Sequence, residues 1–92
     1  MLILSQDRQR VINFKDITEL YVSYIDDDST IYCDTNNDNE IALGFYKDKE
    51  RCKEVLIEIV EHYNKVEKSR LYARSGYTPN ITGNFTYYMP EE

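Results

Sequence analysis

The sequence predicts an α+β fold, in which an antiparallel β-meander of about five short strands precedes one long C-terminal amphipathic helix and a final short strand. Residues 1–46 contain short β-branched and aromatic segments between polar turns. The apolar period then changes at Asp48 to the spacing of a helix face. With 92 residues the chain is expected to form a single domain, divided into the meander (1–46), the helix (48–75) and an aromatic tail with the last strand (76–92).

The five strands of the meander are expected at MLIL (1–4), VINF (11–14), ITELYVSYI (17–25), TIYCD (30–34) and EIALGFY (40–46). Polar segments such as DDDS and TNNDN separate them, and Asp and Asn are favoured in turns because they tolerate left-handed backbone geometry. The short connections favour antiparallel pairing. In the fifth strand, alternation predicts that Ile41, Leu43 and Phe45 point inward and that Tyr46 points outward.

Residues 48–75 are predicted to form one helix that begins at Asp48, a suitable N-cap, and stops at Gly76. Its apolar face follows the i, i+3, i+4, i+7 pattern and consists of Cys52, Val55, Leu56, Ile59, Val60, Tyr63 and Val66. Such a helix would be roughly 40 Å long, which is longer than a small globule needs. Its second half is therefore expected to protrude or fray.

The segment from residue 69 to residue 90 contains no acidic residue, although the whole protein carries a net charge of −6. Residues 84–89 within it alternate as a last strand, with Phe85, Tyr87 and Met89 on one face and Tyr88 on the other. A long segment that lacks acidic residues and is rich in tyrosine suits a contact surface, because tyrosine supplies area with a polar tip.

The same segment holds the residues that we predict to contact a ligand. Guanidinium groups bind phosphate and aromatic faces stack on bases, so the combination favours a small nucleotide, such as a cyclic nucleotide. The predicted ligand-binding residues are Arg70, Arg74, Tyr72, Tyr77, Tyr87 and Tyr88. In a compatible alternative, the tail packs against another subunit. We expect a homo-oligomer, because a long helix and an aromatic tail exceed what one small domain can bury.

The charge is unevenly distributed, since eight acids and no base lie between Asp16 and Tyr46. The remainder carries nine acids and eleven bases, a difference of 11 − 9 = +2. An acidic half of this kind argues against a partner of duplex nucleic acid, which needs phosphate-neutralising bases. It is either a solvated face with turns or a surface that approaches a basic partner.

No membrane partner is expected, because no apolar run approaches the ~20 residues of a spanning helix and MLIL is too short for a signal peptide. Two cysteines do not make a disulfide scaffold, so a cytoplasmic location with reduced thiols is predicted.

The segment DTNNDNE places Asp34, Asn36, Asp38 and Glu40 at alternate positions, as in the opening of a calcium loop. The match fails where such a loop needs glycine and a bidentate glutamate, because Asn39 and Phe45 stand there. A polar hairpin turn explains the segment better, and no metal or other cofactor is expected.

Enzymatic activity is not predicted. His62 is the only histidine, and local spacing places no nucleophile beside it, although Glu58 precedes it by four residues. Cys33 and Cys52 fall on apolar faces and are expected to be small buried side chains. No glycine-rich phosphate loop is present.

Three segments together resemble a family of small proteins carried by phages and prophages of Gram-positive bacteria. They are LSQDRQRVINFKDI (4–17), LGFYKDKERCKEVL (43–56) and YYMPEE (87–92). The resemblance covers most of the chain, with the tyrosine-rich tail as its variable part, and implies no established activity. A meander followed by a helix is also similar to part of a pleckstrin-homology-like fold, which is an analogy of architecture only.

A phage origin implies counter-defence, in one of two ways. The first is an oligomeric sponge that sequesters a nucleotide immune signal, which the aromatic, acid-free tail favours and which we rank ahead. The alternative is an acidic inhibitor that covers a basic surface of a host defence nuclease, which the acidic meander favours. A phage structural or housekeeping component is a third possibility.

Overall fold

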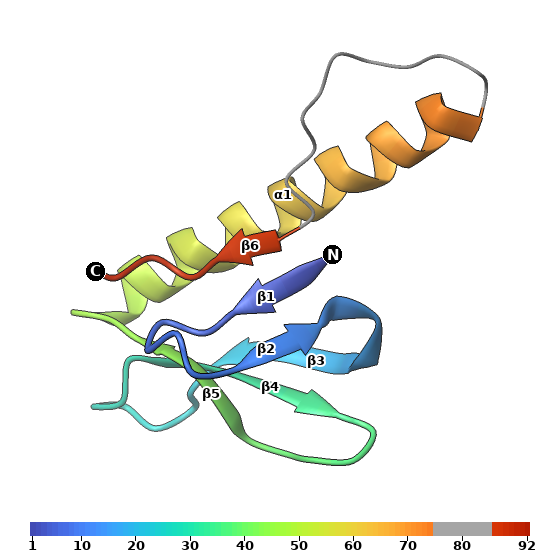
Figure 1. Cartoon of the computed structure of the whole chain (residues 1–92). Coiled ribbons are helices and arrows are strands. Elements are labelled where there is room, and N and C mark those ends of the chain that lie inside the picture. The colour runs from blue at the N-terminus through green and yellow to red at the C-terminus, as the bar shows by residue number, and fades with distance from the viewer. Residues whose placement is uncertain (75–85) are drawn as a thin grey trace.

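Two three-stranded sheets and one long helix make up the fold in the part of the chain that the structure describes (Figure 1). The computed structural model describes residues 1–74 and 86–92, and for residues 70–74 it describes the backbone. The elements are β1 (Leu2–Leu4), β2 (Val11–Asn13), a 3-10 helix (Phe14–Asp16), β3 (Ile17–Val22), β4 (Thr30–Thr35), β5 (Ile41–Phe45), α1 (Lys49–Arg74) and β6 (Thr86–Tyr88). The predicted α+β class, with a long helix and a last strand after it, is confirmed.

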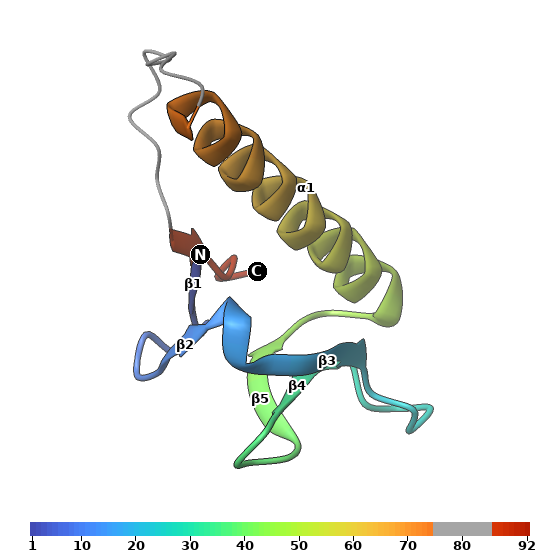
Figure 2. The same ribbon diagram turned by 90° about the vertical axis from the view of Figure 1, so that its right-hand side faces the viewer.

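The strands divide between two sheets, which the sequence did not indicate. β3, β4 and β5 form an antiparallel meander, as predicted. β1 and β2 form an antiparallel hairpin of their own, and β6 joins the other edge of β1 in parallel. The 3-10 helix between β2 and β3 turns the chain from one sheet into the other (Figure 2).

α1 begins and extends as predicted. The Oδ1 atom of Asp48 accepts a hydrogen bond from the backbone N–H of Arg51 at 2.8 Å, which is the N-cap arrangement. The second half of the helix runs past the strands (Figures 1 and 2). The predicted stop at Gly76 lies outside the described residues. Within residues 1–74 and 86–92, no helix is both long and apolar enough to span a bilayer.

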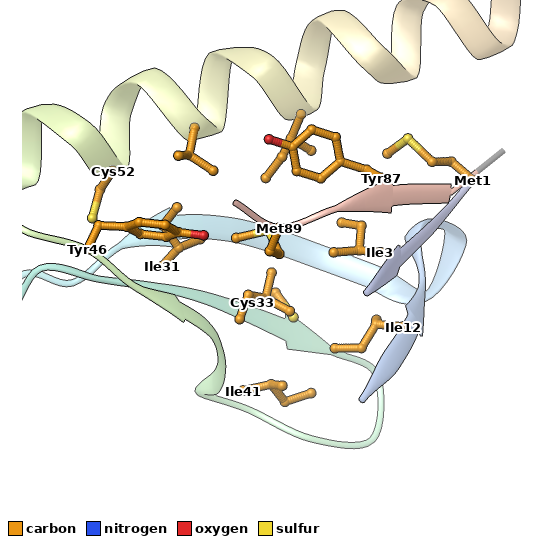
Figure 3. Packing of buried hydrophobic residues seen from close by; sticks show 13 residues of the cluster. Met1, Ile3, Ile12, Ile31, Cys33, Ile41, Tyr46, Cys52, Tyr87 and Met89 are labelled. Carbon is orange, nitrogen blue, oxygen red and sulfur yellow. The ribbon is translucent and has the colours of Figure 1, made fainter. Parts of the chain in front are cut away.

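The hydrophobic core lies between α1 and the inner faces of the two sheets (Figure 3). Cys52, Val55, Ile59 and Val66 of α1 are buried, as the helical pattern predicted. The placement of Val60 on that buried face was wrong, since its side chain is 52% exposed. Successive residues of a helix are rotated by about 100° about its axis. Ile59 is fully buried, so Val60, the next residue, turns toward solvent.

The predicted alternation of β5 was wrong at its end, because a β-bulge shifts the strand by one residue. Ile31 of β4 pairs with Gly44, but Tyr32 pairs with Ala42, so Leu43 is the extra residue. As a result Phe45 is 65% exposed and Tyr46 is 3% exposed. The Tyr46 ring occupies the space beside Gly44, where a Cβ atom would approach a ring atom to 2.7 Å.

Gln6 joins the two sheets and the C-terminal segment. Its Nε2 atom donates to the backbone oxygens of Phe45 and Glu91, each at 2.9 Å. Its Oε1 atom accepts from the backbone N–H of Phe45 at 2.7 Å. One amide side chain thus extends the edge of β5 and holds a segment that lies 85 residues away in sequence.

Replacing Gln6 with alanine should lower the free energy of unfolding by about 1–3 kcal/mol, because three hydrogen bonds of its side chain are lost. Water can partly replace them, since the site is partly exposed to solvent. Urea denaturation measures this directly. Gln9→Ala, an exposed glutamine in the same turn, is the matched control and should change stability little. Equal loss in both variants would contradict the role assigned to Gln6.

Candidate functional site

The residues predicted to bind a nucleotide are only partly described by the structure. Arg70, Tyr72 and Arg74 belong to the last turns of α1, where the backbone alone is described. Tyr77 lies outside the described residues. The arrangement of these four side chains therefore stays a prediction.

The two remaining tyrosines of that prediction, Tyr87 and Tyr88, point to opposite faces of β6. Tyr88 is 53% exposed, whereas Tyr87 is buried in the core. The Tyr87 hydroxyl donates to Oε2 of Glu58 at 3.0 Å, and its ring meets His62 edge-on at 5.6 Å between centroids. Burial and the bond to Glu58 raise the pKa of Tyr87. The structure therefore places Tyr87 in the core and does not bring the two rings together.

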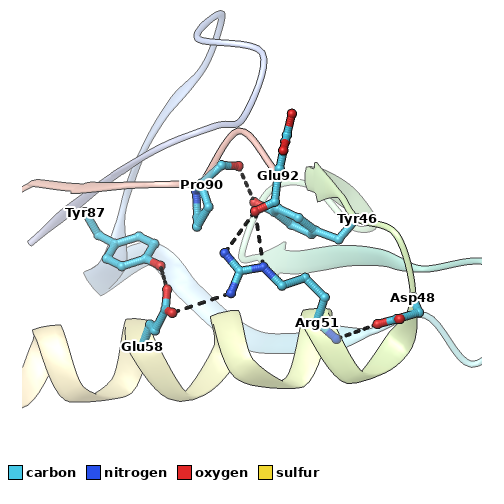
Figure 4. Close-up of polar contacts among 7 residues, drawn as sticks. All are labelled: Tyr46, Asp48, Arg51, Glu58, Tyr87, Pro90 and Glu92. Carbon is cyan, nitrogen blue, oxygen red and sulfur yellow. Dashed lines mark hydrogen bonds and ion pairs between the residues drawn. The ribbon is translucent and has the colours of Figure 1, made fainter.

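A polar cluster at the end of the chain holds the C-terminal segment to α1 (Figure 4). The Nε and Nη2 atoms of Arg51 donate to the backbone oxygen of Glu92 at 3.2 and 2.9 Å, and Nη1 lies 3.6 Å from a Glu58 carboxylate oxygen. The Tyr46 hydroxyl donates to the backbone oxygen of Pro90 at 2.8 Å. A hollow of about 460 Å³ lies beside this cluster. The charge of Arg51 is already balanced by Glu58, so this hollow is a poor anion site and the cluster is structural.

The two cysteines are buried as expected, with relative exposures of 0%. Burial raises the pKa of the Cys33 thiol to about 11, and it raises the pKa of Cys52 as well. The Cys52 thiol donates to the backbone oxygen of Ser29. Both groups are therefore protonated near neutral pH, which is unfavourable for nucleophiles.

The segment that imitates a calcium loop forms the turn between β4 and β5. The Oδ1 atom of Asp34 accepts from the backbone N–H of Glu40 at 2.8 Å, and the Thr35 hydroxyl oxygen accepts from the N–H of Asp38 at 3.0 Å. Glu40 adopts a φ of 56°. These bonds confirm the interpretation as a polar hairpin turn. Among the described residues, no group of three or more His, Cys, Asp or Glu is arranged to hold a metal ion.

A row of three tyrosine rings covers the face of β3 and β4 that is turned away from α1. Tyr21 of β3 pairs directly with Tyr32 of β4, and Ile31 and Cys33 on either side of Tyr32 point into the core. The ring of Tyr21 lies 5.9 Å from that of Tyr32 and 5.5 Å from that of Tyr24, measured between centroids. The interplanar angles are 28° and 16°, so the rings are nearly parallel.

Each ring of the row is fixed by a carboxylate. The hydroxyl of Tyr21 donates to Asp34, that of Tyr24 donates to Glu19 and that of Tyr32 donates to Asp28. The donor–acceptor distances are 3.1, 3.3 and 3.0 Å. We call the three tyrosines together with Glu19, Asp28, Asp34 and Glu40 the acidic tyrosine face.

The ionisation of these groups follows from their contacts. Desolvation, followed by the bond to Asp34, raises the pKa of Tyr21 to about 12. The charge of Glu19 raises the pKa of Tyr24, and the hydrogen bond to Asp28 raises that of Tyr32. The hydrogen bond from Thr30 lowers the pKa of Asp28. The three tyrosines therefore stay neutral hydrogen-bond donors near neutral pH, and Asp28 stays ionised.

The acidic tyrosine face is exposed and hollowed. Tyr24 is 79% exposed and the neighbouring Ile25 is 68% exposed. A hollow of about 200 Å³ lies beside the rings and is lined by Tyr21, Ser23, Tyr24, Ile25, Tyr32 and Glu40. The acidic composition was visible in the sequence. The row itself was missed, because it depends on the register between β3 and β4.

The three segments that carry the resemblance to phage proteins meet around the C-terminal cluster, not at the acidic tyrosine face. Gln6 comes from the first, Tyr46 and Arg51 from the second and Pro90 from the third. The resemblance thus concerns residues that close the fold. It stays a prediction, because comparison with models of protein families, with curated proteins and with solved structures finds no match for this chain.

Proposed function

We propose that this protein is a non-enzymatic binding protein whose acidic tyrosine face docks on a basic surface of a protein partner. The observation that supports this proposal is the row of three stacked tyrosines on one sheet, in which Tyr24 is exposed and Tyr21 and Tyr32 are half-buried. Each hydroxyl of the row is bonded to a carboxylate. This is the acidic inhibitor predicted as the alternative. We rank it ahead of the nucleotide sponge, because stacked tyrosines whose hydroxyls are bonded to carboxylates form an ordered contact surface for a basic protein.

The chemistry of the face supports a protein partner of opposite charge. Exposed tyrosines contribute large contact area at a low cost in side-chain entropy, and aromatic residues are enriched at interfaces. The eight acids between Asp16 and Tyr46 are accompanied by no base in that part of the sequence. Complementary charge of this kind speeds encounter and selects the partner more than it adds affinity.

Binding without catalysis is supported by the state of the nucleophile candidates. Cys33 and Cys52 are buried, and burial raises the pKa of both thiols. Two free cysteines also support a cytoplasmic location, since thiols remain reduced there. A basic host defence protein is the partner that the resemblance to phage proteins implies.

Reversing charge on the face should weaken binding of a basic probe. The double variant Glu19→Lys, Glu40→Lys should bind an oligoarginine peptide about tenfold or more weakly at low salt, because two attractive charges become repulsive. Fluorescence anisotropy of the labelled peptide measures the affinity. Raising the salt concentration should reduce the difference.

The matched control is Glu54→Lys, Glu61→Lys on the exposed side of α1. Both double variants change the net charge from −6 to −6 + 4 = −2. The control should therefore bind the peptide more tightly than the Glu19→Lys, Glu40→Lys variant does, because its acidic tyrosine face is unchanged. Equal weakening in both would show that binding follows net charge and not this face, and absence of binding by the wild type would overturn the proposal.

Sequestration of a nucleotide by the tail stays a second proposal, supported by the acid-free composition of residues 69–90 and by the spacing of Arg70 and Arg74. Calorimetry against a panel of cyclic nucleotides tests it. The Arg70→Ala, Arg74→Ala variant should lose roughly tenfold to a hundredfold in affinity for any nucleotide that the wild type binds. If the wild type binds none of them, the sponge is excluded.

Self-association is proposed to use the outer face of the sheet β2-β1-β6. Leu4 pairs with Val11 on one side and with Tyr88 on the other, and Val11 and Tyr88 are 58% and 53% exposed. Leu2, Asn13 and Thr86 complete a face without charge. Identical copies that each carry a net charge of −6 repel one another, so an uncharged face is where they approach at least cost.

Light scattering should therefore report at least a dimer for the wild type and a monomer of 11.0 kDa for Val11→Glu, which places like charges across the contact. Val60→Glu introduces the same charge at a similarly exposed valine on α1 and should leave the oligomer intact. A wild-type monomer at micromolar concentration would exclude self-association.

A further inference from the structure

We propose that the hollow beside Tyr24 anchors one arginine side chain of the partner. The guanidinium group stacks on the Tyr24 ring and donates hydrogen bonds to the carboxylates of Glu40 and Glu19. This inference rests on the proposed function and adds to it the residue type that the partner presents at the centre of the contact.

The arrangement of the rings selects a flat cation. Tyr32, Tyr21 and Tyr24 stand nearly parallel in one row, with interplanar angles of 28° and 16°. A cage for a round cation, such as a quaternary ammonium, needs rings that face it from several directions. A row of parallel rings offers its flat ends instead, and a planar guanidinium stacks on such a face.

Carboxylates beside the Tyr24 ring provide hydrogen-bond acceptors for the same guanidinium group. Glu40 lines the hollow, and Glu19 accepts the hydrogen bond of the Tyr24 hydroxyl at 3.3 Å. A carboxylate has more acceptor sites than one hydroxyl uses, so Glu19 keeps acceptor capacity for an N–H fork. The hydroxyl bonds also hold the rings in place before binding, which lowers the entropy lost on association.

The size and exposure of the hollow fit one side chain. Its volume of about 200 Å³ is below the ~300–1,000 Å³ of pockets that enclose whole small molecules. Tyr24 is 79% exposed, so a partner reaches the ring without any rearrangement. Ile25, 68% exposed at the rim, provides an apolar surface for the methylene groups of the arginine stem.

The test compares an oligoarginine with an oligolysine peptide of equal length. The two peptides carry the same charge and differ only in the cationic group, guanidinium or ammonium. The wild type should bind the arginine peptide roughly five- to tenfold more tightly, the scale of one stacked cation. Tyr24→Leu should lose most of this preference, because only the carboxylates then distinguish the two cations, while retaining the binding that charge alone provides. Tyr24→Phe keeps the ring and should keep the preference.

Tyr88→Leu is the matched control, since it removes an exposed tyrosine from the other sheet and should leave the preference unchanged. Circular dichroism verifies that each variant is folded. Equal binding of the two peptides by the wild type would overturn the arginine anchor and leave the proposed function standing. A preference as large in Tyr24→Leu as in the wild type would overturn it as well, and binding of neither peptide would overturn both.

Discussion

Closure of the fold depends on the last seven residues, which must lie alongside β1 and end against the first turns of α1. The backbone groups of this segment are bonded one after another: the Met89 N–H donates to Leu4, and the Met89 oxygen accepts from Arg8. The oxygens of Pro90, Glu91 and Glu92 then accept from Tyr46, Gln6 and Arg51. Without this segment β1 would become an edge strand, and the core would lose Tyr87 and Met89.

This closure also decides which surfaces remain for partners. α1 and the C-terminal segment cover the inner faces of both sheets, so the outer faces are left to solvent. The two outer faces differ in chemistry, because the one on β2-β1-β6 is apolar and uncharged whereas the one on β3-β4 carries tyrosines and carboxylates. The two contacts that we propose, with a second copy and with a basic partner, would therefore use separate faces of the domain.

The sequence predicted what depends on local pattern and missed what depends on register. The N-cap at Asp48, the buried Cys52 and the turn between β4 and β5 follow from residue type and spacing, and the structure contains them. The bulge at Leu43 and the parallel docking of β6 require knowledge of pairing partners far away in the chain. The row of tyrosines has the same origin, because Tyr21 and Tyr32 become neighbours only through the alignment of β3 with β4.

The hydrogen bonds between tyrosines and carboxylates have a consequence for how a complex at this face responds to its surroundings. Desolvation raises the pKa of Tyr21, the charge of Glu19 raises that of Tyr24 and the bond to Asp28 raises that of Tyr32. The hydrogen bond from Thr30 lowers the pKa of Asp28. The pKa values of the three tyrosines therefore lie further above neutral pH than usual, and the pKa of Asp28 lies further below it. The charge that these groups present is constant across the pH range of a living cell. Under the proposed function, release of a partner would therefore depend on ionic strength or competition and not on a change in the charge of these four groups.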